Sequence, residues 1–201
     1  MTGLFLALLA GFSPKAMALS LIVPGAGEWS LGETHRAIPF FVVEASSWIS
    51  WGTLQNLRGR TVETYRGFAY HYAGADATRT DEAYWHAVEF YPNRAAYLEG
   101  LWMEARALYP DDPEAQAAYV ASRDVGGTWS WPKESLWFRF QDLRARVRSY
   151  EGWATVSLGL LVLNRLASVV DVFLMEQTRG RVGLDFRGSP TEFSAGIHWR
   201  P

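Results

Sequence analysis

Three long apolar stretches constrain the fold of this 201-residue chain more than any other feature of its sequence. They run from Leu4 to Pro24, from Ala37 to Leu54 and from Trp153 to Met175. A helix needs about 20 mainly apolar residues to cross a bilayer, and the second and third stretches approach that length. Arginines flank both of them, at Arg36, Arg58, Arg148 and Arg179. The pattern favours membrane-spanning helices over the alternative, in which the same segments are core helices of a soluble all-α protein.

The first stretch has two interpretations. Residues 4–12 resemble the apolar region of a signal peptide, and Ala16-Met17-Ala18 fits a small-x-small cleavage site. However, no positive side chain precedes them, and cleavage would remove half of the apolar run. We therefore expect the segment to be retained, with Ser13 capping a short membrane helix that begins at Pro14 and ends at Pro24-Gly25. Residues 3–23 then form either one kinked span or a half-span plus an interfacial piece.

A polar, aromatic-rich region separates the second and third stretches. Its cap residues and prolines predict short helices over 81–91, 93–108 and 113–122. No proline interrupts the chain from Glu134 to Met175, which predicts one long helix, and the second span is expected to continue past Arg58 through Tyr72. The predicted divisions are a membrane hairpin (1–57), an extramembrane domain (58–151), a C-terminal span (152–178) and an extramembrane tail (179–201) that is loop with a short strand.

These elements predict an all-α integral membrane protein with two to three transmembrane helices and a small helical extramembrane domain between the last two. The net charge of −2 argues against a general nucleic-acid binder, and the lack of cysteine excludes iron–sulfur and thiol chemistry. More arginines border the spans on the side of the central domain than on the opposite side. The positive-inside rule therefore favours a cytoplasmic central domain.

Glu44, Arg165 and Asp171 are charged residues within the apolar stretches. Because an ionised side chain in hydrocarbon is costly, such residues usually face the protein interior and pair with one another. We expect an interhelical polar clamp in which Arg165 reaches Glu44, and Asn164 or Ser47 completes the hydrogen bonds. The predicted members are Glu44, Asn164, Arg165, Ser168 and Asp171. The alternatives are a proton relay or ligand site, and for Asp171 an interfacial position near the end of the span.

The segment from Pro24 to Gly32 combines one proline with three glycines. This composition predicts a tight helical-hairpin corner between the first two membrane segments, formed by Pro24, Gly25, Gly27 and Gly32. A phosphate-binding loop is excluded, because no lysine and Ser/Thr pair follows the glycines and no strand precedes them.

No arrangement of residues indicates an enzyme. His86 and Glu89 are three residues apart on one predicted helix and could ligate a metal, but the sequence offers no second such pair. The Gly-x-Ser-x-Gly pattern of a nucleophilic serine is missing, and neither strong span contains a histidine that could ligate haem or chlorophyll. We therefore expect no catalytic residue, no metal and no directly bound cofactor.

Ten tryptophans are the most unusual feature of the composition. Trp29, Trp48, Trp51 and Trp153 lie near predicted span ends, as in an aromatic belt. The tryptophans of the central region either fill its core or anchor a partner, since Trp, Tyr and Arg are over-represented at binding hot spots. The candidate partner or pigment contacts are Phe40, Phe41, Trp48, Trp51, Trp85, Trp102, Trp137 and Trp153.

Three blocks of sequence carry a family resemblance. They are Ser13-Pro14-Lys15-Ala16, the Pro24-Gly25-x-Gly27 corner with Gly32 and Arg36, and Asn164-Arg165-Leu166-x-Ser168-x-x-Asp171. These blocks are similar to an uncharacterised group of small bacterial membrane proteins that have a Pro-Gly-x-Gly-Gln-x-Tyr-x-Gly hairpin and an Asn-Arg-x-x-Ser-x-x-Asp C-terminal span. The chain departs from that pattern at Glu28, where Gln is usual, and at Ser30, where Tyr is usual. The resemblance implies a multi-pass protein of the bacterial inner membrane and implies no chemistry.

Together these features predict a non-enzymatic accessory subunit that stabilises a larger bacterial membrane complex. Its partners would be other integral membrane subunits and membrane lipids. One such setting is a photosynthetic reaction centre–light-harvesting complex, where Phe40, Phe41, Trp48 and Trp51 would touch pigment-binding helices, or the carotenoid or chlorophyll of neighbouring subunits. The alternative function is a small transporter-like or ligand-binding membrane protein that uses Glu44, Arg165 and Asp171.

Overall fold

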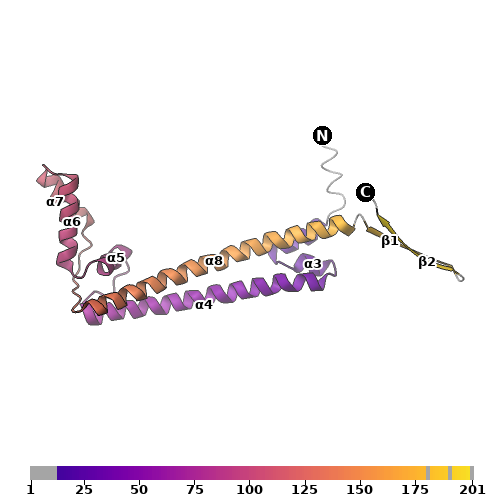
Figure 1. Ribbon diagram of the computed structural model, residues 1–201, viewed down its shortest axis with the longest axis horizontal. Coiled ribbons are helices and arrows are strands. Elements are labelled where there is room, and N and C mark those ends of the chain that lie inside the picture. Colours follow the sequence, from indigo (N-terminus) through magenta and orange to yellow (C-terminus); the bar gives the residue numbers. More distant parts are fainter. Residues whose placement is uncertain (1–12, 180–181, 190–191, 200–201) are drawn as a thin grey trace. The chain divides into compact units, whose positions relative to one another are not determined.

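The computed structural model describes residues 13–179, 182–189 and 192–199, which form helices followed by two strands (Figure 1). The helices are α2 (Pro14–Ile22), α3 (Ala26–Ser30), α4 (Thr34–Ala73), α5 (Glu82–Phe90), α6 (Arg94–Leu108), α7 (Pro113–Arg123) and α8 (Glu134–Arg179), and the strands are β1 (Val182–Ser189) and β2 (Glu192–Trp199). The expected helical class is confirmed over residues 13–179. The tail, expected to be loop with a short strand, forms an antiparallel hairpin that pairs Val182 with Trp199. Residues 3–12 of the first apolar stretch lie outside the described residues.

The short helices begin where their sequence signals predict. Ser13, Asn93 and Asp112 each accept a hydrogen bond from the backbone N–H three residues further on, at 3.3, 2.8 and 2.9 Å. These bonds satisfy N–H groups that the first turn of a helix leaves without a partner. Asp81 occupies the corresponding position of α5 but makes no capping bond, because its carboxylate is held by Arg79 at 2.6 and 2.7 Å.

The two long helices extend as far as the sequence predicts. The helix containing the second apolar stretch continues past Arg58 to Ala73, and the helix that begins at Glu134 is unbroken to Arg179. Among the described residues, the segment Glu134–Thr178 is the one helix that is both long and apolar enough to cross a membrane. The second predicted span, residues 37–54, does not reach the same hydropathy, since Glu44 and three serines interrupt it. The expected number of two to three spans is therefore not established.

The chain divides into two compact units. The terminal unit comprises Met1–Gly52 and Ala154–Pro201, and the central unit comprises Thr53–Trp153. Each long helix contributes one part to each unit. These divisions lie a few residues from the boundaries at 57/58 and 151/152 that the sequence predicts.

In the terminal unit, a glycine-rich corner joins α2, α3 and α4. Gly25 precedes α3 with a φ of 92° and Gly32 follows it with a φ of 83°, a backbone region that residues with a Cβ rarely adopt. Gly27 is required for another reason. A Cβ at this position would collide with Ser20 Oγ and the Ala16 carbonyl oxygen, and would lie 2.8 Å from a methyl group of Val172. The glycines therefore allow α2, α3 and α8 to approach closely.

The central unit has a core made mainly of aromatic side chains. Tyr84, Trp85 and Phe140 are fully buried, and Tyr65 packs edge-to-face on both Trp85 and Phe140. Each buried indole N–H donates to a backbone carbonyl oxygen, for example Trp85 to Arg79 at 2.9 Å. Buried Trp residues usually find such a partner, because an unpaired indole N–H is costly in a core. Trp85 is therefore a core residue, and it has no exposed surface that a partner or pigment could contact.

Candidate functional site

The predicted clamp residues of α8 lie along one face of the helix in the terminal unit. Asn164, Ser168 and Asp171 are separated by four and three residues, a spacing that places side chains above one another on a helix. Arg165 lies beside them. These four residues contact the segment from α3 to the first half of α4 at three successive positions, and we call them the polar seam. The structure therefore distributes the predicted clamp over three contacts rather than one.

The first contact of the seam is the expected pair of Glu44 and Arg165. Arg165 Nη2 donates to Glu44 Oε1 at 2.7 Å and Nη1 to Oε2 at 3.2 Å. Asn164 Nδ2 donates to Glu44 Oε2 at 3.3 Å and to the Phe40 carbonyl oxygen at 3.0 Å. Trp48 Nε1 adds a further hydrogen bond to Oε1 at 3.0 Å. Asn164 therefore completes the pair as expected from the sequence, and four donor groups neutralise and orient one carboxylate.

The second contact is a fully buried carboxylate that is not among the site residues expected from the sequence. Glu28 is 0% exposed, and its oxygens accept hydrogen bonds from Ser20 Oγ at 2.9 Å and from Ser168 Oγ at 2.8 Å. The same two hydroxyls also accept hydrogen bonds from the corner. The backbone N–H of Gly25 donates to Ser168 Oγ at 2.9 Å, and that of Gly27 donates to Ser20 Oγ at 3.2 Å. The corner, α2 and α8 are thereby joined through one side chain. The signal in the sequence is a single acidic residue between glycines in an otherwise apolar segment.

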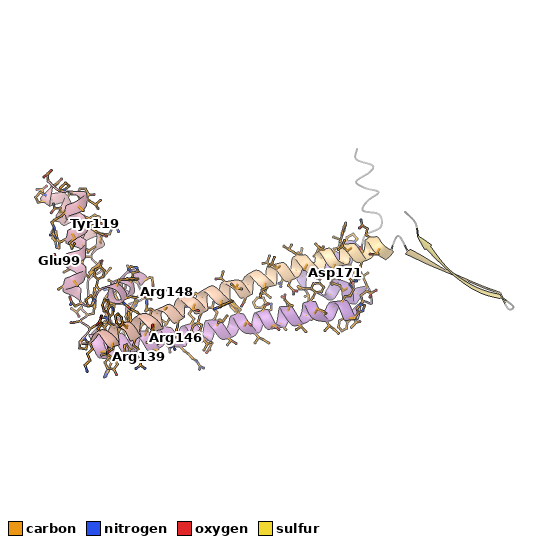
Figure 2. All side chains as sticks on the ribbon, viewed as in Figure 1. Glu99, Tyr119, Arg139, Arg146, Arg148 and Asp171 are labelled. Atoms are coloured by element: carbon orange, nitrogen blue, oxygen red, sulfur yellow. The ribbon has the colours of Figure 1, made fainter. Side chains whose placement is uncertain are left out.

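The third contact involves Asp171, which is labelled on α8 in Figure 2 and pairs with Arg36 at the start of α4. Arg36 Nε and Nη2 donate to the two carboxylate oxygens at 3.0 and 2.5 Å, which is the two-pronged geometry of strong Arg–carboxylate pairs. Asp171 is thus part of the seam through Arg36 and not through Glu44. Five residues further along α8, Glu176 accepts the backbone N–H of Ser13 at 2.8 Å and holds the start of α2.

The candidate partner aromatics fall into exposed and buried groups. Trp48, Trp102 and Trp153 are exposed to 48%, 36% and 61%, and Trp51 packs edge-to-face against Trp48. Phe40 and Phe41 are half-buried on α4. Trp137 is half-buried against the central core, and its indole N–H donates to the Glu89 carbonyl oxygen at 2.8 Å. With Trp85 excluded by its burial, the exposed candidates are best placed to meet a partner.

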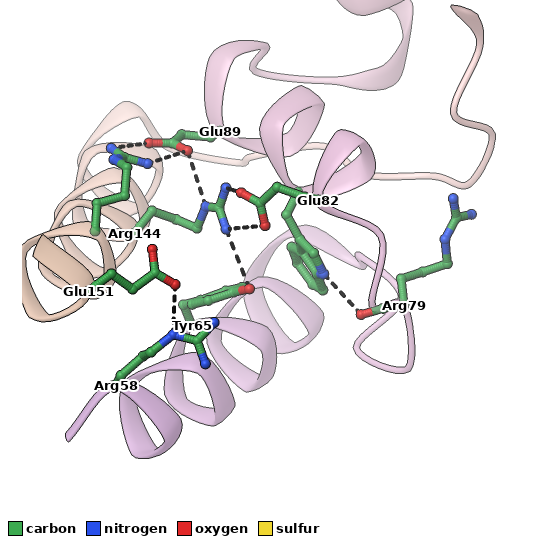
Figure 3. Close-up of polar contacts among 9 residues, drawn as sticks. Arg58, Tyr65, Arg79, Glu82, Glu89, Arg144 and Glu151 are labelled. Atoms are coloured by element: carbon green, nitrogen blue, oxygen red, sulfur yellow. Dashed lines mark hydrogen bonds and ion pairs between the residues drawn. The ribbon is translucent and has the colours of Figure 1, made fainter. Parts of the chain in front are cut away.

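A second polar network lies in the central unit, around Glu89 and Arg144 (Figure 3). The buried Glu89 carboxylate accepts hydrogen bonds from Arg144 Nε at 3.1 Å and from both terminal nitrogens of Arg148 at 2.8 and 3.0 Å. Arg144 also donates to Glu82 and to the Tyr65 hydroxyl oxygen. Burial alone would lower the pKa of Arg144, but the contacts with Glu82 and Glu89 outweigh it and raise that pKa.

This network changes the interpretation of Glu89, which the sequence offers as a metal ligand together with His86. Two guanidinium groups compensate the carboxylate, and the ring of His86 stacks near that of Phe90 at a centroid distance of 4.4 Å. Within the described residues no cluster of three or more His, Asp or Glu side chains could hold a metal ion.

Comparison with known proteins finds no match, whether among family models, curated proteins or solved structures. The family resemblance of the corner and of the Asn164–Asp171 segment therefore stays a prediction, and function has to be argued from the geometry of the two units.

Proposed function

We infer that the terminal unit is embedded in a membrane, because its large apolar side chains are mostly exposed and several of its polar side chains are buried. Its buried polar side chains are Ser20, Glu28, Ser47, Ser157, Asn164 and Ser168. Its exposed large apolar side chains are Leu21, Ile22, Val23, Trp29, Ile38, Val42, Val43, Trp48, Ile49, Val156, Leu158, Leu160, Val162, Leu163, Leu166, Val170 and Leu174. In the most apolar window of α8, 28% of the residues are buried, whereas a core helix of a soluble protein would be mostly buried.

This distribution matches the physics of helix association in lipid. Hydrocarbon chains solvate leucine and valine as well as a protein core does, so helices in a bilayer associate through small residues and hydrogen bonds. Most buried positions of the terminal unit carry small or polar side chains, chiefly alanine and serine, and the larger apolar exceptions include Leu161, Val172 and Met175. The central unit differs, because a cluster of aromatic side chains that includes Tyr84, Trp85 and Phe140 forms its buried core. The two units thus have the surfaces expected of a membrane anchor and of a water-exposed domain.

We propose that the chain is a non-enzymatic membrane subunit whose terminal unit is embedded in the bilayer and whose central unit binds neighbouring proteins. The observation that carries the proposal is the apolar exterior and polar interior of the terminal unit. In this proposal the helix segments 34–52 and 154–178 cross the membrane, and the polar seam joins them. Exposed Trp48, Trp102 and Trp153 are the proposed contacts with other membrane subunits.

Fractionation and native electrophoresis test the two parts of this proposal separately. We expect the chain to resist extraction by sodium carbonate and to require detergent. After mild detergent treatment of its native membranes, it should migrate in an assembly much larger than itself, and mass spectrometry of that band should identify its partners. Release by carbonate would refute the anchor, and migration as a monomer or homo-oligomer would refute the subunit role. The photosynthetic setting remains a prediction that the identity of those partners decides.

The transporter-like alternative requires a charged group that can bind and release an ion or ligand. Glu44 and Arg165 compensate each other, and Asp171 is paired with Arg36. This pairing supports a structural role for the seam over a transport role. Reconstituted chain carrying Glu44→Gln provides the test, because a transporter would lose proton or ligand flux, whereas a structural subunit has no flux to lose.

A further inference from the structure

A cavity of about 700 Å³ lies in the central unit, lined by residues of α4, α8 and the start of α5. Four arginines line it, namely Arg58, Arg66, Arg144 and Arg148. Guanidinium groups present planar sets of N–H donors that fit oxygen atoms of carboxylates and phosphates. The cavity therefore has the donor chemistry of a site for an anion with several oxygen atoms.

Carboxylates of the chain occupy only part of this donor set. Glu89 binds both Arg144 and Arg148, and Arg144 is also bound by Glu82, which lines the cavity together with Glu63 and Glu151. Arg58 donates through Nε alone to Glu151 at 2.7 Å (Figure 3). Its terminal nitrogens therefore remain available within the part of the chain that the structure describes.

Arg66 is the unusual member of the set. Its Nε is buried and has no hydrogen-bond partner among the described residues. Its guanidinium carbon lies 5.9 Å from the centre of the Trp85 ring, which is an attractive contact but supplies no acceptor. Glu63 also lines the cavity, and it is exposed. Arg66 is half-buried, and one of its N–H donors thus lacks an acceptor, which is costly; an oxygen acceptor from outside the chain would reduce this cost.

The size of the cavity indicates how large the ligand is. A volume of about 700 Å³ falls within the range of sites for organic ligands and exceeds what one inorganic anion needs. The walls add few apolar groups, and Tyr65 and Thr80 contribute hydroxyls. A polar group that carries phosphate fits these walls better than an apolar molecule.

We propose that this cavity is a binding site for a phosphate-bearing anion, with Arg66 and Arg58 as its principal donors. One source is the headgroup of an anionic phospholipid, and this source rests on the proposed membrane anchor. Arg148 lies five residues before Trp153, where the apolar part of α8 begins, which is about 7.5 Å along a helix. Basic pockets at such positions bind anionic headgroups. The other source is a soluble phosphorylated molecule.

Native mass spectrometry of the full chain in mild detergent separates these sources. The probes are phosphatidylglycerol, phosphatidylcholine and inorganic phosphate, and thermal unfolding is followed with each. We expect phosphatidylglycerol to stay bound and to raise the unfolding temperature, while phosphatidylcholine does so much less. The variant Arg66→Gln should weaken this binding at least about tenfold, since one charge-assisted donor group is lost. Arg66→Lys keeps the positive charge but lacks Nε, so its affinity for phosphatidylglycerol should lie between those of the wild type and Arg66→Gln.

The matched control is Arg146→Gln, which removes an exposed arginine of α8 that does not line the cavity and should bind like the wild type. Binding of inorganic phosphate through Arg66 without selective binding of phosphatidylglycerol would assign the site to a soluble ligand. Equal binding by wild type and Arg66→Gln, or no binding of any probe, would overturn the proposal, as would equal binding of both lipids without binding of inorganic phosphate through Arg66. A chain that carbonate releases but that binds phosphate through Arg66 would refute the anchor and leave the site intact.

Discussion

At the scale of single residues, Glu28 links the corner of the terminal unit to α2 and α8 through its hydrogen bonds with Ser20 and Ser168. It is fully buried and is the common acceptor of the Ser20 and Ser168 hydroxyls. Replacing it with Ala would leave both hydroxyls without that acceptor and create a cavity. We expect Glu28→Ala to lower the free energy of unfolding by about 2–4 kcal/mol. Glu28→Gln retains an oxygen acceptor and the shape, and should cost less than about 1 kcal/mol. Thermal unfolding in detergent, followed by tryptophan fluorescence, measures both. Equal stability of the Ala variant and the wild type would contradict this role.

The corner glycines provide a second residue-scale test. Gly27→Ala places a methyl group against Ser20, the Ala16 carbonyl oxygen and Val172, and the backbone atom cannot move aside without shifting α2. We expect a loss of about 1–3 kcal/mol, as for other overpacked positions. Gly52→Ala is the control, because a methyl group at this position in the interior of α4 would meet no atom within 4 Å. It should be neutral or slightly stabilising, since Ala favours helix. Similar unfolding temperatures for the two variants would show that the corner is not closely packed.

At the scale of elements, an ion pair ties the start of α6 to the end of α7. Arg94 donates to both oxygens of Asp124, and Asp124 also accepts the N–H of Gly126 at 2.9 Å. The hydrogen bonds from Arg94 lower the pKa of Asp124. A lowered pKa in the folded state stabilises the fold above the unfolded pKa, near 3.9, and this contribution disappears as the pH falls through the lower folded value. Asp124→Asn should therefore cost about 0.5–1 kcal/mol at neutral pH, with the difference from wild type vanishing in strong acid. Denaturant titrations at pH 7, 4 and 2 measure this. A difference that stays constant with pH would exclude the ion pair as its origin.

At this scale, the sequence predicts local features such as helix starts, whereas most long-range contacts cannot be predicted from it. Helix starts at Ser13, Asn93 and Asp112 are local, because a side chain and a backbone N–H three residues away decide them. The pair of Glu44 and Arg165 was also predictable, since few charged residues lie in the apolar stretches. The pairing of Asp171 with Arg36 and the burial of Glu28 were not, because they depend on how α4 and α3, respectively, pack against α8, which is more than a hundred residues away in the sequence. Trp85 illustrates the same limit: its side chain suits a core and a partner surface equally, and only packing decides.

At the scale of the whole chain, the reversed surface of the terminal unit can be tested against that of the central unit. Leu163 of α8 and Leu108 of α6 are exposed to 62% and 58%. In water, replacing either leucine with Lys would change the free energy of unfolding little, because an exposed leucine contributes little to stability. In a bilayer the same change is costly, at about 2.5–3.5 kcal/mol for a charge at the middle of a spanning helix. We therefore expect Leu163→Lys to reduce the carbonate-resistant fraction of the chain severalfold, whereas Leu108→Lys leaves it unchanged. If both variants behave like the wild type, the leucines of α8 face water and the membrane anchor is refuted. If both variants lose membrane association, the central unit also contacts lipid, and the assignment of the terminal unit alone to the membrane is wrong.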